Sequence, residues 1–189
     1  MKKALIDYTL RIRLPIILFV GVISFIGTYF FSRAERDNVG YSPVQPISFS
    51  HKLHAGTMQI DCQYCHAGVT ISPYATIPPV STCMNCHAIA RKDKPEIVRL
   101  TNYYNKGIAL PWKRVHRLPD YAYFNHSVHV NKGIDCSNCH GPIEDLDGAM
   151  QVSEFTMAAC LNCHRNAPEL LQQSHIIKKG PENCYACHR

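Results

Sequence analysis

The sequence has no cysteine outside five short motifs, and it has only one long hydrophobic run. It contains a single tryptophan, and charged residues make up 18% of the chain. After residue 31 the apolar residues are scattered among prolines, tyrosines and polar residues. Such a segment would struggle to bury enough apolar surface alone. These shortages argue against a conventional hydrophobic core and favour a domain built around bound groups.

All ten cysteines stand in five copies of the motif C-x-x-C-H. This pattern predicts covalent attachment of c-type haem, because the two thiols bind the ring and the histidine supplies one axial ligand to iron. The predicted cofactors are therefore five haems c. The attachment residues would be Cys62, Cys65, Cys83, Cys86, Cys136, Cys139, Cys160, Cys163, Cys184 and Cys187, with His66, His87, His140, His164 and His188 as proximal ligands.

Zinc sites and disulfides are the competing interpretations of these cysteines. Zinc ribbons also use C-x-x-C pairs, usually as closed sets of four ligands. An even number of cysteines in an exported protein would suit disulfides. Neither interpretation explains why a histidine follows every pair at once.

The hydrophobic run, Leu14 to Phe31, predicts a membrane helix. Its 18 residues would span about 27 Å as a helix, close to the thickness of a hydrocarbon core of about 30 Å. Lys2, Lys3, Arg11 and Arg13 precede it against the single acid Asp7, which predicts a cytoplasmic N-terminus and a haem domain on the extracytoplasmic side of the inner (cytoplasmic) membrane. A cleaved signal peptide is the alternative, but no A-x-A pattern ends the run. We expect an uncleaved single-pass anchor in contact with membrane lipid.

An internal repeat organises the rest of the chain. The pattern F-x-H-x-x-H, followed by D-C-x-x-C-H and a further C-x-x-C-H motif, occurs over about 49–90 and again over 124–165. We therefore expect an N-terminus and anchor at 1–32, a linker at 33–48 and a pentahaem domain at 49–189, whose last unit is 166–189. The expected fold is mainly α with much irregular structure, packed around haem. Short helices are expected over 93–107 and 166–180.

The residues that could supply the sixth iron ligand lie in and between the repeats. Histidines at i and i+3 share one side of a helical turn, so each H-x-x-H pair could reach two neighbouring irons. Met157 is the candidate sulfur ligand, although methionine is more often a core residue. The predicted distal ligands are His51, His54, His116, His126, His129 and Met157, and His175 is a further possibility for the fifth haem.

The net charge of +6 could indicate nucleic acid or anionic lipid. Haem propionates offer a simpler explanation, since arginine and lysine pair readily with carboxylates. No nucleic-acid motif is present, and no nucleic-acid partner is expected.

The F-x-H-x-x-H and C-x-x-C-H arrangement resembles the class III multihaem cytochromes c. The anchor, the segment Phe49–Gly56, the run Ile77-Pro78-Pro79 and the segment 115–126 look like the pentahaem subunit, ActA, of alternative complex III. That resemblance implies a quinol-oxidising respiratory complex. Its expected partners are polytopic quinol-oxidising membrane subunits, an iron–sulfur subunit, and a monohaem cytochrome c or an oxidase as acceptor.

The supply of six histidines beyond the five motifs favours an electron carrier, because irons with all ligand positions filled cannot bind substrate. No catalytic residue is expected. A multihaem enzyme with an open haem, such as a nitrite or hydroxylamine converter, is the alternative from another class. An anchored quinol dehydrogenase of another respiratory chain is a third interpretation.

Overall fold

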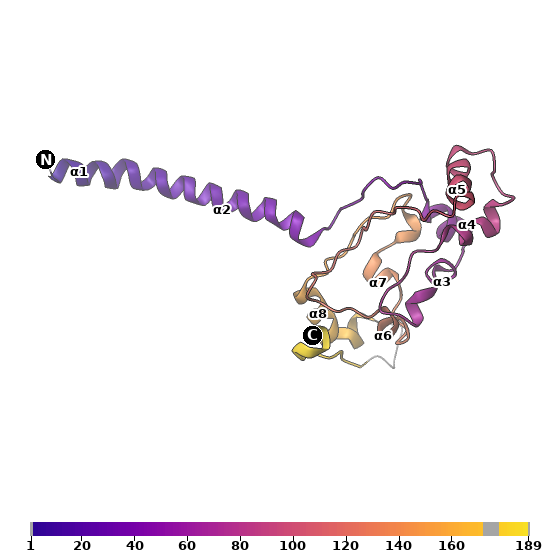
Figure 1. Cartoon of the computed structure of the whole chain (residues 1–189). Coiled ribbons are helices and arrows are strands. Elements are labelled where there is room, and N and C mark those ends of the chain that lie inside the picture. Colours follow the sequence, from indigo (N-terminus) through magenta and orange to yellow (C-terminus); the bar gives the residue numbers. More distant parts are fainter. Residues whose placement is uncertain (1, 172–177, 189) are drawn as a thin grey trace. The chain divides into compact units, whose positions relative to one another are not determined.

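The computed structural model describes residues 2–171 and 178–188. The chain divides into two units, Met1–Asn38 and Val39–Arg189. The first unit is one nearly continuous helix made of α1 (Lys2–Tyr8), the π-helical segment η1 (Thr9–Arg13) and α2 (Leu14–Asp37) (Figure 1).

The N-terminal helix is longer than the hydrophobic run alone predicts. Residues Ile6–Ser32 are long and apolar enough to cross a membrane, and none of their side chains is buried within the chain. The π-turn has a local cause, because Pro15 carries no N–H and disturbs the ordinary helical ladder. The N–H of Leu14 donates to the carbonyl of Thr9, five residues back.

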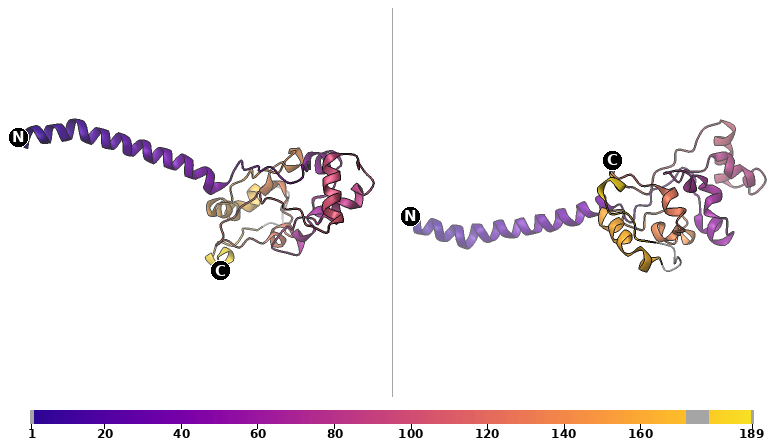
Figure 2. Two further views of the ribbon diagram at one scale, coloured as in Figure 1. Left: turned by 45° about the horizontal axis from the view of Figure 1, so that its top comes forward. Right: turned by 90° about the horizontal axis from the view of Figure 1, so that it is seen from below.

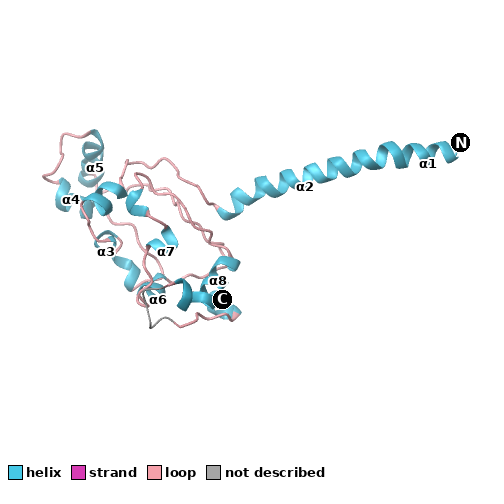
Figure 3. Cartoon of the chain, turned by 180° about the vertical axis from the view of Figure 1, so that it is seen from behind, coloured by secondary structure: helices cyan, strands magenta, loops and turns pink. Residues whose placement is uncertain are grey.

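The second unit consists of short helices joined by long irregular segments, and the described residues contain no strand (Figure 3). The predicted mainly α fold with much irregular structure is therefore confirmed. The elements are η2 (Lys52–Thr57), α3 (Cys62–Cys65), η3 (Ala67–Thr70), α4 (Val80–His87), α5 (Pro95–Asn105), α6 (His126–Val130), α7 (Ser137–His140), η4 (Ile143–Asp145), α8 (Met157–Leu170) and α9 (Cys184–Cys187).

The expected helix near 93–107 is confirmed as α5, although its bounds, Pro95–Asn105, are narrower than expected. Pro95 occupies the first turn, and Gly107 follows the helix with φ +63°, as a glycine helix stop requires. Lys94 rather than Asp93 is the N-cap residue, and its side chain makes no capping hydrogen bond. The expected helix at 166–180 is also wrong in its bounds. Helix α8 begins at Met157, where the Thr156 hydroxyl caps it, and ends at Leu170.

The hydrophobic core of the second unit is small. Ile47, Val80, Leu100 and Leu110 form its buried cluster. Helices α4 and α5 pack on each other there, and their ribbons lie together at one end of this unit in Figure 2. Helices α4 and α5 lie at one end of this unit, α8 and the C-terminus lie at the other, and α3, α6 and α7 lie between them (Figures 1 and 3). The C-x-x-C-H motifs are therefore spread along the whole domain.

Candidate haem sites

The cysteines of every motif lie on a single turn of helix. Side chains at i and i+3 are neighbours on a helical surface, so each turn presents its two thiols together. Capping residues fix several of these turns: Asp61 Oδ1 accepts from the N–H of Gln63 at 2.7 Å, and Asn183 Oδ1 accepts from that of Ala186 at 3.0 Å. Asp135 plays the same part at the third motif by accepting from the Ser137 N–H at 2.8 Å. Asp61 is the N-cap residue of α3, and Asp135, which immediately precedes the N-cap residue Cys136 of α7, caps the first turn in the same way.

All ten cysteines are free thiols in the structure. No group of three or more histidine, cysteine or acidic side chains gathers as a metal site among residues 2–171 and 178–188. The two competing interpretations, disulfides and closed zinc sites, gain no support from this arrangement.

Four of the five motif histidines are anchored by a backbone carbonyl. Nδ1 of His66 binds the carbonyl of Thr76 at 2.8 Å, and Nδ1 of His87 binds that of Ala90 at 3.2 Å. The corresponding bonds run from His164 to Pro181 at 2.7 Å and from His188 to Tyr121 at 2.9 Å. Histidines that bind metal usually donate their other ring N–H in this way, which fixes the tautomer. Nε2 is left for iron at each of these four positions.

The two H-x-x-H pairs have the same surroundings in both repeats. Phe49 stacks on His54 at 4.4 Å between centroids and meets His51 edge-on at 4.9 Å. Phe124 stacks on His129 at 4.4 Å and meets His126 edge-on at 4.8 Å. The phenylalanine of the repeated pattern therefore orients both imidazoles. Its recurrence was visible in the sequence, but this role was not predicted.

The Nδ1 atoms of these distal candidates are also committed to carbonyl groups, with one exception. His54 binds the carbonyl of Ser50, and His129 binds that of Asn125, both at 2.8 Å. His126 reaches the carbonyl of Pro73, also at 2.8 Å. His51 Nδ1 is buried and has no hydrogen-bond partner in the structure. Burial, and then the neighbouring His66, lower the pKa of His51 to about 4, which keeps its ring neutral at pH 7.

Three pairs of rings have the spacing of two ligands on one metal ion. Two imidazoles bound at about 2.0–2.1 Å on opposite sides of a metal would place their centroids roughly 6 Å apart. The centroids are 6.2 Å apart for His54 and His87, and 6.1 Å apart for His129 and His164. For His126 and His140 the separation is 6.4 Å with nearly parallel rings. The residues present therefore fit axial ligation of haem iron.

Apart from His51, three further distal candidates remain outside these ring pairs. His116 lies beside His140, with centroids 4.4 Å apart, and burial and then His126 lower the pKa of His116. Met157 stands at the first position of α8 with 63% of its surface exposed. His175 lies outside the described residues. The ring contact that the structure gives His188 is with Tyr121, at 5.8 Å.

Thiols of neighbouring motifs lie close enough to affect one another's pKa. Burial and then Cys62 and Cys86 raise the pKa of Cys65, so the first motif neighbours the second. Burial, and then Cys62 with which it can hydrogen-bond, raise the pKa of Cys136 to about 11. Partial burial, and then Cys163, raise the pKa of the Cys139 thiol. Burial, and then Cys187, raise the pKa of the Cys160 thiol. Thiols of motifs two and one, one and three, three and four, and four and five are therefore neighbours.

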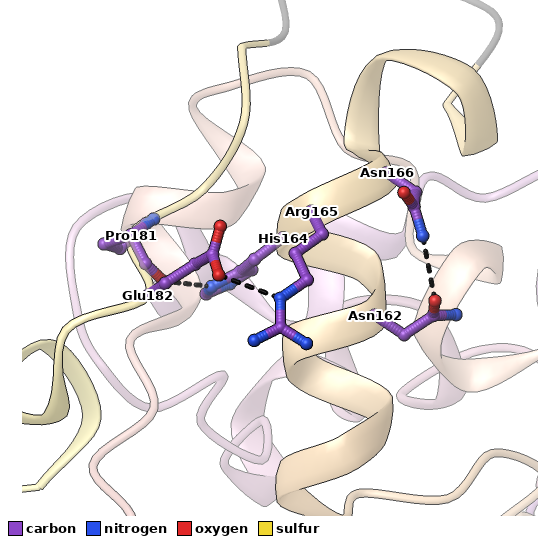
Figure 4. Close-up of polar contacts among 6 residues, drawn as sticks. All are labelled: Asn162, His164, Arg165, Asn166, Pro181 and Glu182. Carbon is purple, nitrogen blue, oxygen red and sulfur yellow. Dashed lines mark hydrogen bonds and ion pairs between the residues drawn. The ribbon is translucent and has the colours of Figure 1, made fainter.

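The fifth motif is joined to the fourth through the segment 178–182 (Figure 4). Pro181 supplies the carbonyl that anchors His164, and the next residue, Glu182, accepts from Arg165 Nε at 2.8 Å. The Gly180 N–H donates to the His164 carbonyl at 2.8 Å. These three bonds hold residues 180–182, which shortly precede α9, against the part of α8 that carries the fourth motif.

Comparison with known proteins agrees with this geometry. A class III cytochrome c family model matches residues 30–107, and a model for cytochrome c7 and related cytochromes c matches residues 122–189. A relative from Nitratidesulfovibrio vulgaris, described as the multiheme cytochrome c subunit of a menaquinone reductase, is 26% identical over 167 residues. The match covers 77% of each chain. Residues 30–107 and 122–189 are thus similar to multihaem cytochromes c of the class III type, and the helical second unit with its five motifs is consistent with an electron carrier rather than a catalytic enzyme.

Proposed function

We propose that the chain binds five haems c and carries electrons between a quinone-linked membrane complex and its redox partner. The observation that carries this proposal is the arrangement of the helices that bear the motifs, which extends from α4 at one end of the second unit through α3 and α7 to α8 and the C-terminus at the other. Haem iron supplies one-electron redox chemistry when it is bound. A continuous series of sites, rather than isolated ones, is what transfer of electrons along a domain requires.

The chain's own residues would hold the five rings as follows. Each motif supplies two thiols and a proximal histidine. His51 and His126 serve the first motif of their repeats, and His54 and His129 serve the second, in keeping with the ring separations and with the neighbouring positions of His51 and His66. Met157 is the remaining described candidate for the fifth site, whereas His116 lies beside His140 of the third motif. An iron whose two axial positions are both filled by protein ligands cannot bind substrate, which supports an electron carrier over an enzyme with an open haem.

The apolar helix Ile6–Ser32 would anchor this carrier in the cytoplasmic membrane. The excess of lysine and arginine before the run orients the N-terminus toward the cytoplasm. The domain from residue 49 would then lie on the extracytoplasmic side. Polytopic subunits that bind quinone, together with an iron–sulfur subunit, are the partners this arrangement calls for, and a monohaem cytochrome c or an oxidase would accept the electrons.

Two directions of electron flow are open to such a subunit. The resemblance to alternative complex III favours oxidation of quinol. The relative from Nitratidesulfovibrio vulgaris belongs to a menaquinone reductase, which favours the opposite direction. We place quinol oxidation first, because the anchor and the segments 49–56, 77–87 and 115–126 all take part in that resemblance.

Gentle detergent purification of the tagged full-length chain tests the assembly. We expect polytopic membrane subunits and an iron–sulfur subunit to co-purify, and their identification by mass spectrometry reads this out. Adding menaquinol to the oxidised complex should then reduce haem c, as followed by absorbance. Recovery of the chain alone would contradict the proposal. Rapid oxidation of the reduced complex by menaquinone, with no reduction by menaquinol, would favour the reductase.

A further inference from the structure

His140 differs from the other motif histidines in what its Nδ1 atom contacts. At the other four motifs the partner is a backbone carbonyl. At the third motif the partner is a side chain, because His140 Nδ1 lies 3.2 Å from Nε2 of His116. This bond joins residues 24 positions apart.

The geometry of this contact is that of a hydrogen bond and not of two ligands on one metal. The two rings are perpendicular, and their centroids are only 4.4 Å apart. Trans ligands would need roughly 6 Å, from metal–nitrogen bonds of about 2.0–2.1 Å each. The nearly parallel ring of His126, at 6.4 Å from His140, has the required separation. The third site thus has a ligand pair without His116.

The protonation states follow from the bonds. If His140 binds iron through Nε2, its Nδ1 carries the hydrogen and donates it, so Nε2 of His116 must accept. A neutral His116 then holds its own hydrogen on Nδ1. The Met150 backbone lies close enough to His116 to act on its pKa, and it is the neighbouring group available to accept that hydrogen.

Several contacts fix His116 in this position. Val115 before it is buried, and the Arg117 N–H after it donates to Gln151 Oε1 at 3.0 Å. Gln151 itself is fully buried. The ring of Phe155 meets His116 at 6.0 Å and His140 at 6.4 Å, in both cases edge-on. The segment that carries His116 is therefore held from both sides.

We propose that His116 is a positioning residue: its Nε2 accepts the Nδ1–H of His140, orients that ring and raises its basicity toward the third haem iron. An imidazole nitrogen is a stronger hydrogen-bond acceptor than an amide carbonyl, so His140 gains more imidazolate character than the other motif histidines. A more basic ligand stabilises the oxidised iron. The third site should consequently have a lower reduction potential than its His126–His140 ligand pair would give alone. This inference rests on haem attachment at Cys136 and Cys139.

The test compares full-length holoprotein variants by redox titration and by electron paramagnetic resonance. His116→Leu should keep the haem count and all low-spin signals of the parent protein. The reduction potential of one haem should rise by at least about 59 mV, which corresponds to a tenfold change in the oxidised-to-reduced ratio for one electron. His116→Gln retains an acceptor oxygen and should move that potential less. Phe155→Leu, which removes the aromatic contacts but no hydrogen bond, is the matched control and should leave the potential in place.

Two results would overturn the proposal. A new high-spin signal in His116→Leu would mean that His116 is an axial ligand. Unchanged potentials in that variant would mean that the hydrogen bond has no effect on iron. If His116→Leu fails to mature, His116→Gln decides: its failure as well would indicate a purely structural role. The intact mass of the parent protein shows first whether all five haems are attached. If the third haem were absent, the parent's mass would already be too low, and the proposed function itself would have failed.

Discussion

Replacing Gly180 with alanine should displace the proximal histidine of the fourth motif. A Cβ at this position would lie 2.5 Å from Cγ, 2.8 Å from Cδ2 and 2.9 Å from Cβ of His164. Carbon atoms in ordinary contact are about 3.5–4.0 Å apart, so either the imidazole or segment 178–182 must move by about 1 Å. The root of the His164 side chain cannot rotate away, because its Nδ1 is bound to the Pro181 carbonyl at 2.7 Å.

The expected cost of Gly180→Ala follows from this overlap. Overpacking of a tight contact typically lowers the free energy of unfolding by about 1–3 kcal/mol. Denaturant unfolding followed by circular dichroism measures this loss, and the low-spin spectrum of one haem should shift in the same variant. Gly148→Ala is the matched control, since its Cβ would meet only Ser42 Oγ at 3.8 Å. If Gly180→Ala were as stable as Gly148→Ala and left the haem spectra unchanged, the packing of segment 178–182 on His164 would be refuted.

Three further predictions concern the ligands, a cap and a buried amide. His129→Leu should convert one low-spin haem into a high-spin haem at unchanged haem count, as measured by electron paramagnetic resonance. Asp135→Ala should lower the free energy of unfolding by about 0.5–2 kcal/mol through loss of the cap, measured by denaturant unfolding. Hydrogen bonds from the Ser137 hydroxyl and N–H lower the pKa of Asp135, so its stabilising effect should be present above about pH 3.9 and be lost as the pH falls through the lowered value. Gln151→Leu leaves the Arg117 N–H without its acceptor and should cost about 1–3 kcal/mol in thermal unfolding.

Each of these predictions has a contradicting result. If every haem of the His129→Leu protein remained low-spin, His129 would not be an iron ligand. An Asp135→Ala protein with the same stability as Asp135→Asn and the parent at neutral pH would mean that the cap contributes nothing. A Gln151→Leu protein of parental stability would show that water replaces the lost bond.

Local spacing in the sequence predicts which residues attach haem, and it also predicted that the two histidines of each pair share one helical turn. The i, i+3 spacing of each H-x-x-H pair survives folding, because both pairs lie on one helical turn in the structure. The helix that begins at Pro95 was also predictable, since proline and glycine mark its two ends.

The hydrogen bonds that orient the histidine rings could not be predicted, because the acceptors lie far away along the chain. His188 finds its acceptor at Tyr121, 67 residues earlier, and His126 finds its acceptor at Pro73, 53 residues earlier. The role of His116 depends in the same way on where His140 lies. A histidine between two motifs was naturally interpreted as a ligand, and only the ring geometry gives it a different role.

The central claim is that all five C-x-x-C-H motifs hold haem, and intact-mass spectrometry of the purified full-length chain tests it most directly. The account predicts the mass of the polypeptide plus five covalently bound haems, unchanged after denaturation and treatment with a metal chelator. A mass with fewer haems, or one that falls to that of the bare chain with the chelator, would contradict it.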